Sequence, residues 1–420
     1  TIDQMLAVDQ PTATRILGLR GLAGIDARRA ATAAADLLHT LPATESPAPL
    51  MDPFLNLRGG ADLLATALET HPPQADQALL MLRHLYAAGR SDARLDTLLS
   101  RLAGIHAEVP QLTPEELLAL ALEAEQQGDA ERGETVFRRA DLACFRCHAV
   151  NQAGGQVGPD LSPLGATSPV EYIVKSIYDP DAQKKEAFMT RIVLMIDGQQ
   201  YTGIVANRTD DRLVLKLADG RTVELPLADV EFEAEGKSLM PEGLVKFMTR
   251  QEVLDLVKFL SLLGKPGTPY SIRQSSNIQR WKLLTNPASG LLTTIPNDEF
   301  FRDQVLRSGL WESVYARVDG HLPLDEVTRR TAHPTVYLQG ELNVSAGGTV
   351  DWRLNDPAGV HLWVNGESLD PGTPQPIELV PGRHTLTLRI DTTQRSTDTV
   401  RWDFLRLPNS PAQWAVVDGM

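Results

Sequence analysis

The sequence predicts a multidomain α+β protein with N-terminal helices, a mixed middle segment and a C-terminal β-sandwich. Its 420 residues suit about three domains at roughly 150 residues each. Apolar residues recur every three to four positions in the first 128 residues and every second position in much of the remainder, which are the periods of helices and strands. All six tryptophans lie after a Gly/Pro-rich linker, which marks a change of domain. The predicted domains are residues 1–128, 129–267 and 270–420.

Residues 1–128 are predicted to form an α-helical region. Successive amphipathic runs joined by short turns are typical of an α-solenoid, and the region resembles a HEAT- or armadillo-like stack, although no motif repeats at a clear period. Breaks are expected at Pro47-Ala48-Pro49, Pro72-Pro73, Gly89 and Pro110, because proline and glycine interrupt helices. The predicted helices span residues 12–22, 26–38, 57–69, 75–88, 92–102 and 114–127.

Residues 129–267 change pattern twice. A helix is predicted over 129–138, and Ser168-Pro169-Val170-Glu171 is typical of a capping box that starts another. Residues 187–234 then alternate with period two and predict an inserted small β-barrel or meander of four or five strands. Asp197-Gly198 and Asp219-Gly220 are its expected hairpin turns. A last helix is predicted over 249–263.

Residues 270–420 are predicted to form a β-sandwich, because alternating runs are separated by turn residues such as Asn365-Gly366 and Pro381-Gly382. The pattern around Trp363 and His384 is similar to that of carbohydrate-binding-like and protective-antigen-like sandwiches. Tryptophans can stack on sugar rings, but a role in the sandwich core is the favoured interpretation. The predicted strands span residues 335–338, 349–354, 360–364 and 384–390.

The charge balance excludes two classes of partner. With 54 acidic and 40 basic residues the net charge is −14, which argues against a nucleic-acid surface and against an anionic-membrane patch. No apolar run approaches the roughly 18 residues of a membrane span. The chain opens at Thr1 with Asp3 close behind, so no signal peptide is visible and a mature form or a fragment is expected.

The motif Cys144-Phe145-Arg146-Cys147-His148 contains both cysteines of the chain. Cys-x-x-Cys-His is the attachment signature of c-type haem: one helical turn aligns the two thiols along the haem edge, and the adjacent imidazole reaches the iron. A thioredoxin-like pair would need a βαβ context, and a zinc site would need further Cys or His ligands at metal-binding spacing. The sequence therefore predicts one covalent haem c, held by Cys144, Cys147 and His148, and no disulfide.

A His-ligated haem has either a second axial ligand or an open site. Met189 and Met195 lie in strand-like patterns and Met248 lies at the start of the last helix, so core packing is the favoured role of all three. Met240 stands in an irregular Ser-Leu-Met-Pro-Glu-Gly segment, which suits a ligand loop better than a gap-filling role.

Two further features support a haem site. His148 should donate its Nδ1–H to a backbone carbonyl, and Pro159 in Gly158-Pro159-Asp160-Leu161 is the expected acceptor. Gly133 and Phe137 on one helix and Phe259 on the last helix predict a close helix crossing that would clamp the haem, although any amphipathic pair carries such residues.

Together these segments resemble a class I cytochrome c in which a strand-rich insertion separates the haem motif from Met240. The combination is similar to the haem-binding cytochrome c domain common in Planctomycetes and Verrucomicrobia, and the match covers about a third of the chain. The resemblance implies axial ligation by His148 and Met240, thioether bonds to Cys144 and Cys147, and a haem-binding loop with Pro159 and Leu161. The matching residues are Gly133, Phe137, Cys144, Cys147, His148, Gly154, Gly155, Gly158, Pro159, Asp160, Leu161, Asp179, Pro180, Asp197, Gly198, Gly203, Ser238, Leu239, Met240, Pro241, Gly243 and Leu244.

The leading functional hypothesis is a monohaem electron-transfer protein rather than an enzyme, accepting electrons from a dehydrogenase and passing them to an unidentified acceptor. It would work in the periplasm or another extracytoplasmic compartment, where haem c is attached. One alternative is a haem enzyme or a gas or redox sensor with an open or labile distal site. The other is a carbohydrate-binding protein that acts through the C-terminal sandwich.

Seven acids and one base lie between Gln111 and Val136. A solvated helix face is the favoured interpretation of this stretch. The alternative is a docking patch for a basic redox partner, because complementary charge accelerates encounter.

Overall fold

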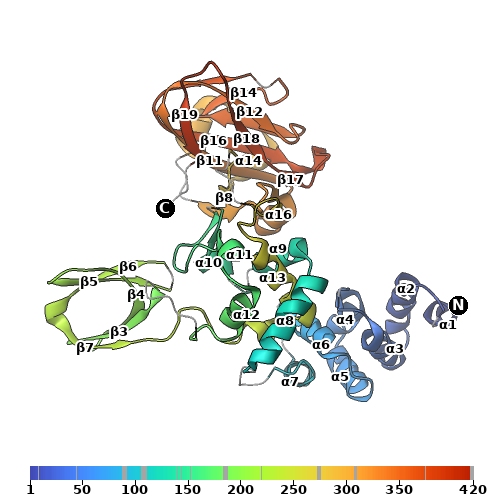
Figure 1. Ribbon diagram of the computed structural model, residues 1–420. Helices are drawn as coiled ribbons and strands as arrows, with labels where there is room; N and C mark the ends of the chain where they lie inside the picture. Colours follow the sequence, from blue (N-terminus) through green and yellow to red (C-terminus); the bar gives the residue numbers. More distant parts are fainter. Residues whose placement is uncertain are drawn as a thin grey trace. The chain divides into compact units, whose positions relative to one another are not determined.

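The chain has mixed α and β structure and folds into two units, one helical and one rich in strands, as a computed structural model shows (Figure 1). The helical unit comprises Thr1–Leu142, Pro169–Lys185 and Met240–Phe259, and the strand-rich unit comprises Ala143–Ser168, Glu186–Leu239 and Leu260–Met420. The predicted middle segment is therefore shared between the two units. The structure describes residues 1–7, 9–43, 45–87, 92–105, 111–139, 141–142, 144–151, 153–182, 188–218, 220–271, 276–306, 310–373 and 375–416.

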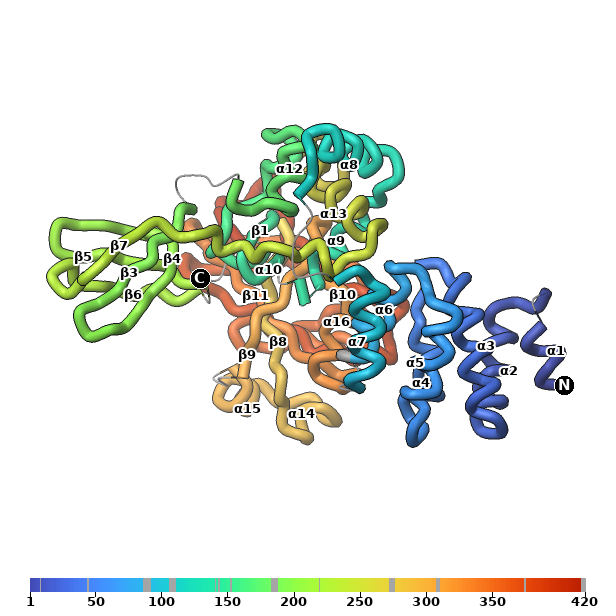
Figure 2. The backbone as a smooth tube through the Cα atoms, turned by 90° about the horizontal axis from the view of Figure 1, so that it is seen from below, coloured from blue at the N-terminus to red at the C-terminus, as the bar shows by residue number. Residues whose placement is uncertain are grey.

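Helices near the N-terminus of the helical unit lie side by side in chain order (Figure 2). Their core combines leucines with small side chains such as Ala30 and Ala34 of α3, both fully buried, which let neighbouring helices approach closely. These helices are α1 (Ile2–Leu6), α2 (Thr12–Ala23), α3 (Ala27–Thr40), α4 (Ala48–Leu55), α5 (Gly60–Thr70), α6 (Ala75–Ala87), α7 (Ala93–Leu102) and α8 (Pro114–Gln127).

The six helices predicted in this region are present, with ends that differ by a few residues, but α1 and α4 were not predicted. The break expected at Pro47-Ala48-Pro49 is confirmed in part: Pro47 is the N-cap at which α4 begins, but Ala48 and Pro49 already lie in the helix. Proline is tolerated in a first helical turn, where backbone N–H groups have no partner within the helix. The breaks predicted at Gly89 and Pro110 lie outside the described residues.

Helices from the middle of the chain complete the helical unit, and α12 packs against α8. The predicted capping box at Ser168 is wrong, because Pro169 is the N-cap of α12 and no side chain caps it. Ser168 instead ends the preceding helix, α11 (Leu164–Thr167), where its N–H bonds the carbonyl of Leu164. The added helices are α9 (Ala130–Phe137), α12 (Val170–Tyr178), η3 (Leu244–Phe247) and α13 (Arg250–Leu262).

The insertion is a five-stranded antiparallel sheet in the order β6-β5-β4-β3-β7. Gly198 has a φ of +85° in the predicted turn between β3 and β4, whereas Asp219 lies outside the described residues. β3 to β6 form a meander and β7 returns to pair with β3. No pairing of the described strands joins β6 to β7, so these pairings do not close the sheet into a barrel. Its strands are β3 (Thr190–Met195), β4 (Gln200–Arg208), β5 (Arg212–Leu217), β6 (Thr222–Pro226) and β7 (Val230–Glu235).

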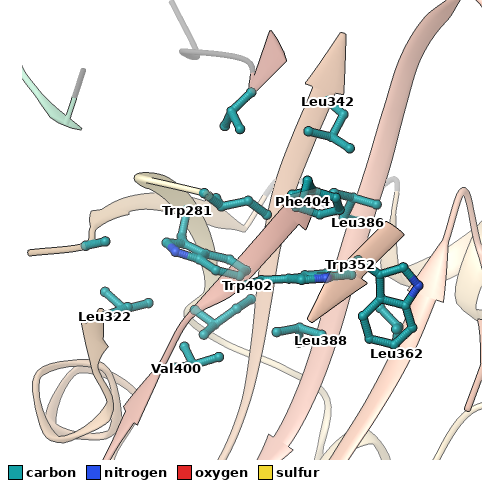
Figure 3. Packing of buried hydrophobic residues seen from close by; sticks show 14 of the residues in the cluster. Trp281, Leu322, Leu342, Trp352, Leu362, Leu386, Leu388, Val400, Trp402 and Phe404 are labelled. Atoms are coloured by element: carbon teal, nitrogen blue, oxygen red, sulfur yellow. The ribbon is translucent and has the colours of Figure 1, made fainter. Parts of the chain in front are cut away.

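The C-terminal region is sandwich-like, with the larger sheet in the order β14-β13-β16-β11-β8-β9 and β19 added to β11, and the smaller in the order β15-β12-β18. One hydrophobic core includes buried residues of both sheets (Figure 3). The larger sheet contains β8 (Arg280–Leu284), β9 (Trp311–Tyr315), β11 (Thr335–Ala346), β13 (Val360–Val364), β14 (Glu367–Leu369), β16 (Gly382–Asp391) and β19 (Gln413–Val416), and the smaller contains β12 (Gly348–Leu354), β15 (Ile377–Leu379) and β18 (Trp402–Arg406).

Most tryptophans of this region fill its core. Trp281, Trp352 and Trp402 are buried in the shared core (Figure 3). Trp363 is fully buried on the other side of the larger sheet, where its ring stacks on Phe301 with centroids 4.1 Å apart. The favoured interpretation of the tryptophans is therefore confirmed for these four residues, and Trp363 is not available to stack on a sugar.

Asp356 ties two loops of the sandwich together. Its carboxylate accepts hydrogen bonds from the backbone N–H groups of Ala358 (2.9 Å), Ser396 (2.9 Å) and Thr397 (3.2 Å). Burial alone would raise the pKa of Asp356, but these hydrogen bonds, with the nearby Arg395, outweigh it and lower the pKa to about 2. The pKa of an aspartate in the unfolded chain is about 3.9. The difference corresponds to about 2 kcal/mol of stability, which is present above pH ~4 and is lost as the pH falls toward 2.

We expect Asp356→Asn to lower the free energy of unfolding by about 2 kcal/mol at pH 7, and this deficit to shrink as the pH approaches 2. Urea titrations at several pH values would measure both effects. Asp325→Asn is the matched control, because Asp325 is exposed and its carboxylate pairs with Arg329, one helical turn further along. A deficit that stays constant down to pH 2 would contradict the ionised role of Asp356.

Candidate functional site

The Cys-x-x-Cys-His motif forms one helical turn, α10 (Cys144–Cys147), and the N–H of His148 continues it by bonding the Cys144 carbonyl at 2.9 Å. Residues three apart on a helix lie on one side, so the turn brings the two thiols together. Both cysteines are half-buried, and no disulfide joins them in the described chain. Burial raises the pKa of the Cys147 thiol, with Arg146 opposing it.

His148 is held by the hydrogen bond that the sequence predicts. Its Nδ1 lies 2.9 Å from the carbonyl oxygen of Pro159. Because a carbonyl only accepts, Nδ1 carries the proton and Nε2 of the neutral ring carries the lone pair. Burial lowers the pKa of His148, although the bond to Pro159 partly offsets this. A neutral imidazole with an oriented Nε2 is the form that binds a metal.

Two adjacent glycines after the motif pack against its backbone. A Cβ on Gly154 would lie 2.2 Å from the carbonyl oxygen of His148, and a Cβ on Gly155 would lie 2.0 Å from that of Arg146. Gly154 also has a φ of +119°, which favours glycine. Only glycine therefore lets this segment approach the motif so closely.

The loop that follows is hydrogen-bonded along the motif. The N–H groups of Gly155 and Gly158 each donate at 2.7 Å, to the carbonyls of Phe145 and Cys147. Leu161 donates its N–H to Ala149 at 2.9 Å, and its side chain is half-buried. Pro159 and Leu161 thus belong to the loop beside His148, and their observed contacts with the motif segment are made by backbone groups.

Gly158 lies directly against the imidazole of His148. A Cβ at this position would lie 2.7 Å from Cε1 and 2.9 Å from Nδ1, so Gly158→Ala must displace either the ring or the loop. We expect a loss of about 1–3 kcal/mol in the free energy of unfolding, the usual cost of overpacking, measured by urea titration. Gly290→Ala is the control, because a Cβ there meets nothing within 4 Å. Equal stability of the two variants would contradict this contact.

The predicted helix crossing is present in the helical unit. A Cβ on Gly133 of α9 would lie 1.9 Å from the carbonyl oxygen of Asp255 in α13, so the two backbones touch. The rings of Phe137 and Phe259 are 5.7 Å apart, with an angle of 49° between their planes. The close crossing is thus an observed feature, whereas its role in clamping a haem stays a prediction.

Sequence reasoning missed an ion pair at this crossing between the half-exposed Arg132 and the buried Asp255. Asp255 accepts bonds from Arg132 Nε at 2.8 Å and Nη2 at 2.9 Å, and from the N–H of Asp129 at 2.7 Å. The pair joins α13 to the start of α9 and satisfies a carboxylate that is almost fully buried. The signal in the sequence was an aspartate among the apolar residues of the last helix.

The methionines occupy different environments. Met195 is buried in the core of the inserted sheet, and Met248 is buried at the end of η3, as their favoured packing role requires. Met240 is half-buried in an irregular segment before η3, and Met189 is half-buried before β3. Met240 belongs to the helical unit and His148 to the strand-rich unit, and their pairing as axial ligands stays a prediction.

The acidic stretch between 111 and 136 serves several helix ends. Glu116 accepts a bond from the N–H of Thr113 at 2.8 Å in a capping box. Asp129 caps α9 by accepting the N–H of Arg132, and Glu123 pairs with Arg250. Acids at helix N-termini are stabilised by the helix dipole. These roles within the chain account for part of the negative charge without invoking a partner protein.

Among the residues that the structure describes, no group of three or more His, Cys, Asp and Glu side chains is placed to bind a metal ion. A haem iron does not need such a group, because the porphyrin supplies four nitrogens. None of the described helices is long and apolar enough to cross a membrane.

No family model matches the sequence, and no curated protein matches it significantly. The resemblance to a cytochrome c domain therefore rests on the motif residues and their spacing.

Proposed function

We propose that the chain is a monohaem c-type cytochrome that transfers electrons. The observation that carries this proposal is the arrangement of His148. Its imidazole is adjacent to the Cys-x-x-Cys turn, donates Nδ1–H to Pro159 and packs under Gly158. A histidine oriented through one nitrogen presents the other to a metal.

The residues of the motif suit a covalent haem c. Cys144 and Cys147 lie on one turn and are not joined by a disulfide, as two thioether bonds to one haem would require. The bound haem would supply one-electron redox chemistry. The chain's own contribution is to hold the imidazole of His148 in one orientation and one tautomer through the loop from Gly154 to Leu161.

Met240 is the proposed second axial ligand, on the basis of its irregular loop and of the resemblance. Thioether ligation raises the reduction potential, which suits a protein that accepts electrons from a dehydrogenase. The finer fold assignment belongs to this proposal: a class I cytochrome c fold with an inserted sheet, preceded by an α-solenoid. An extracytoplasmic location, with a redox partner protein on each side of the transfer, follows from the chemistry of haem attachment.

Absorption spectra of the purified protein would test the proposal. We expect a haem that resists acid-acetone extraction, a low-spin ferric spectrum with a weak deep-red methionine band, and no response of the ferrous protein to CO. High-spin iron that binds CO readily would favour the haem enzyme or sensor and would remove Met240 from the iron. A protein without covalent haem after expression with a haem-attachment system would overturn the proposal.

The carbohydrate-binding alternative has less support. Four of the six tryptophans are buried, so they cannot provide the exposed platforms on which sugar rings stack. The absence of binding by the full chain to a broad glycan panel would leave the alternative without support.

A further inference from the structure

We propose that Arg280 and Tyr315 of the C-terminal sandwich are positioning residues for the haem-attachment loop. This inference rests on the proposed function, because it gives these residues a role toward the haem motif. It also assigns the sandwich a place in the architecture of the site, in addition to any binding role of its own. All the residues involved belong to the strand-rich unit.

A cluster of four residues joins the sandwich to the motif. Arg280 donates from Nη2 to the carbonyl oxygen of Gly154 at 2.5 Å, and its guanidinium lies 5.5 Å from the centroid of the Tyr315 ring. The Tyr315 ring stacks on Phe145, between the two cysteines of the motif, with centroids 5.5 Å apart and planes 19° apart. Arginine is suited to this position because it can bond a carbonyl while its plane contacts an aromatic ring.

The sandwich offers a rigid base for these contacts. Arg280 and Tyr315 are cross-strand partners, directly opposite each other on β8 and β9. The next residue of β8, Trp281, is fully buried in the sandwich core, and β8 also pairs with β11. Because both side chains project from a paired, well-packed hairpin, they can hold the loop without losing much conformational freedom of their own.

Asn151 makes a second hydrogen bond between this segment and the C-terminal region. Asn151 donates from Nδ2 to the carbonyl oxygen of Val318 at 3.2 Å and from its backbone N–H to Ser162 Oγ at 2.8 Å. Asn151 is buried with a φ of +49°, in the turn between the short strands β1 (Ala149–Val150) and β2 (Ala153–Gly154). The sandwich therefore holds this hairpin both at its turn and, through Arg280, at its end.

The contacts of Arg280 and Tyr315 with the loop, called the brace below, reach the proposed iron ligand His148 through the backbone. Gly154 packs on the carbonyl of His148, and the N–H of Gly155 bonds the carbonyl of Phe145. Movement of Gly154 away from Arg280 would loosen both contacts, and with them the turn that carries the thiols and the imidazole. Small changes in the orientation of a ligating histidine alter the properties of the metal.

Amide hydrogen exchange in the full chain would test the inference. We expect Arg280→Ala and Tyr315→Ala to speed exchange of the Gly155 and Gly158 amides by about tenfold, with little change in β11 and β16. Tyr315→Phe keeps the ring and should behave as the wild type. Arg383→Ala is the matched control, because Arg383 is a mostly exposed arginine of the same sheet.

A second readout separates positioning from general stability. In the haem-loaded protein, Arg280→Ala should shift the midpoint potential, whereas Arg383→Ala should not. Wild-type exchange at Gly155 and Gly158 in both alanine variants would overturn the inference, as would faster exchange spread equally over β11 and β16. A wild-type protein without covalent haem would instead defeat the proposed function, and the exchange measurements would still test the brace.

Discussion

Cys144→Ala combined with Cys147→Ala is expected to abolish covalent haem attachment completely. The two thiols lie on one helical turn and are the only cysteines of the chain, so no other residue can form a thioether bond. Purified protein would be extracted with acid-acetone, and the haem remaining with the polypeptide would be measured from its pyridine haemochrome spectrum.

Arg146→Ala is the matched control for this experiment. Arg146 is exposed on the same turn, between the two cysteines, and its replacement leaves both thiols in place. The control should retain covalent haem at the wild-type level. Haem that stays with the polypeptide in the double cysteine variant would contradict the assignment of these residues.

Met240→Ala is expected to convert low-spin iron to a form that is high-spin or binds CO when reduced. Loss of the thioether should also lower the reduction potential by on the order of 0.1 V, since axial ligands move haem potentials over about 0.8 V. The change would be followed by visible spectra with and without CO and by a redox titration.

Met195→Ala provides the comparison for Met240→Ala. Met195 is buried in the inserted sheet, so its replacement should cost about 2–5 kcal/mol of stability while the spectrum of the haem stays as in the wild type. An unchanged spectrum and potential in Met240→Ala would point to Met195, Met248 or a histidine as the ligand.

The local signals in the sequence were sufficient for many elements. Helices such as α8, with Thr113 and Glu116 in a capping box, begin and end where their own residues dictate. The Asn365-Gly366 turn also follows from the two residues, whose φ values are +52° and +82°. The hydrogen bond from His148 to Pro159 was predictable because the two residues are only eleven positions apart and a ligating histidine needs such a partner.

Other features depend on residues that are far apart in the chain. Nothing in the local sequence identifies the partner in three such contacts: the pairing of β7 with β3, the burial of Trp363 against Phe301, and the ion pair between Arg132 and Asp255. Each contact forms between segments that the fold brings together. The sequence around one residue does not show which distant residue it will contact.

For the candidate site, the residue types and spacing of Cys144, Cys147 and His148 already predicted a covalent haem. The contacts that hold these residues in place are visible only in the tertiary structure. The contacts of Gly154 and Gly158 required a folded loop, and the brace from Arg280 and Tyr315 lies more than a hundred residues away in the sequence. A motif can carry its chemistry in five adjacent residues because the reaction needs those groups together. The residues that orient these groups are set by packing between segments that are distant in the sequence. The sequence of any one segment therefore does not reveal them.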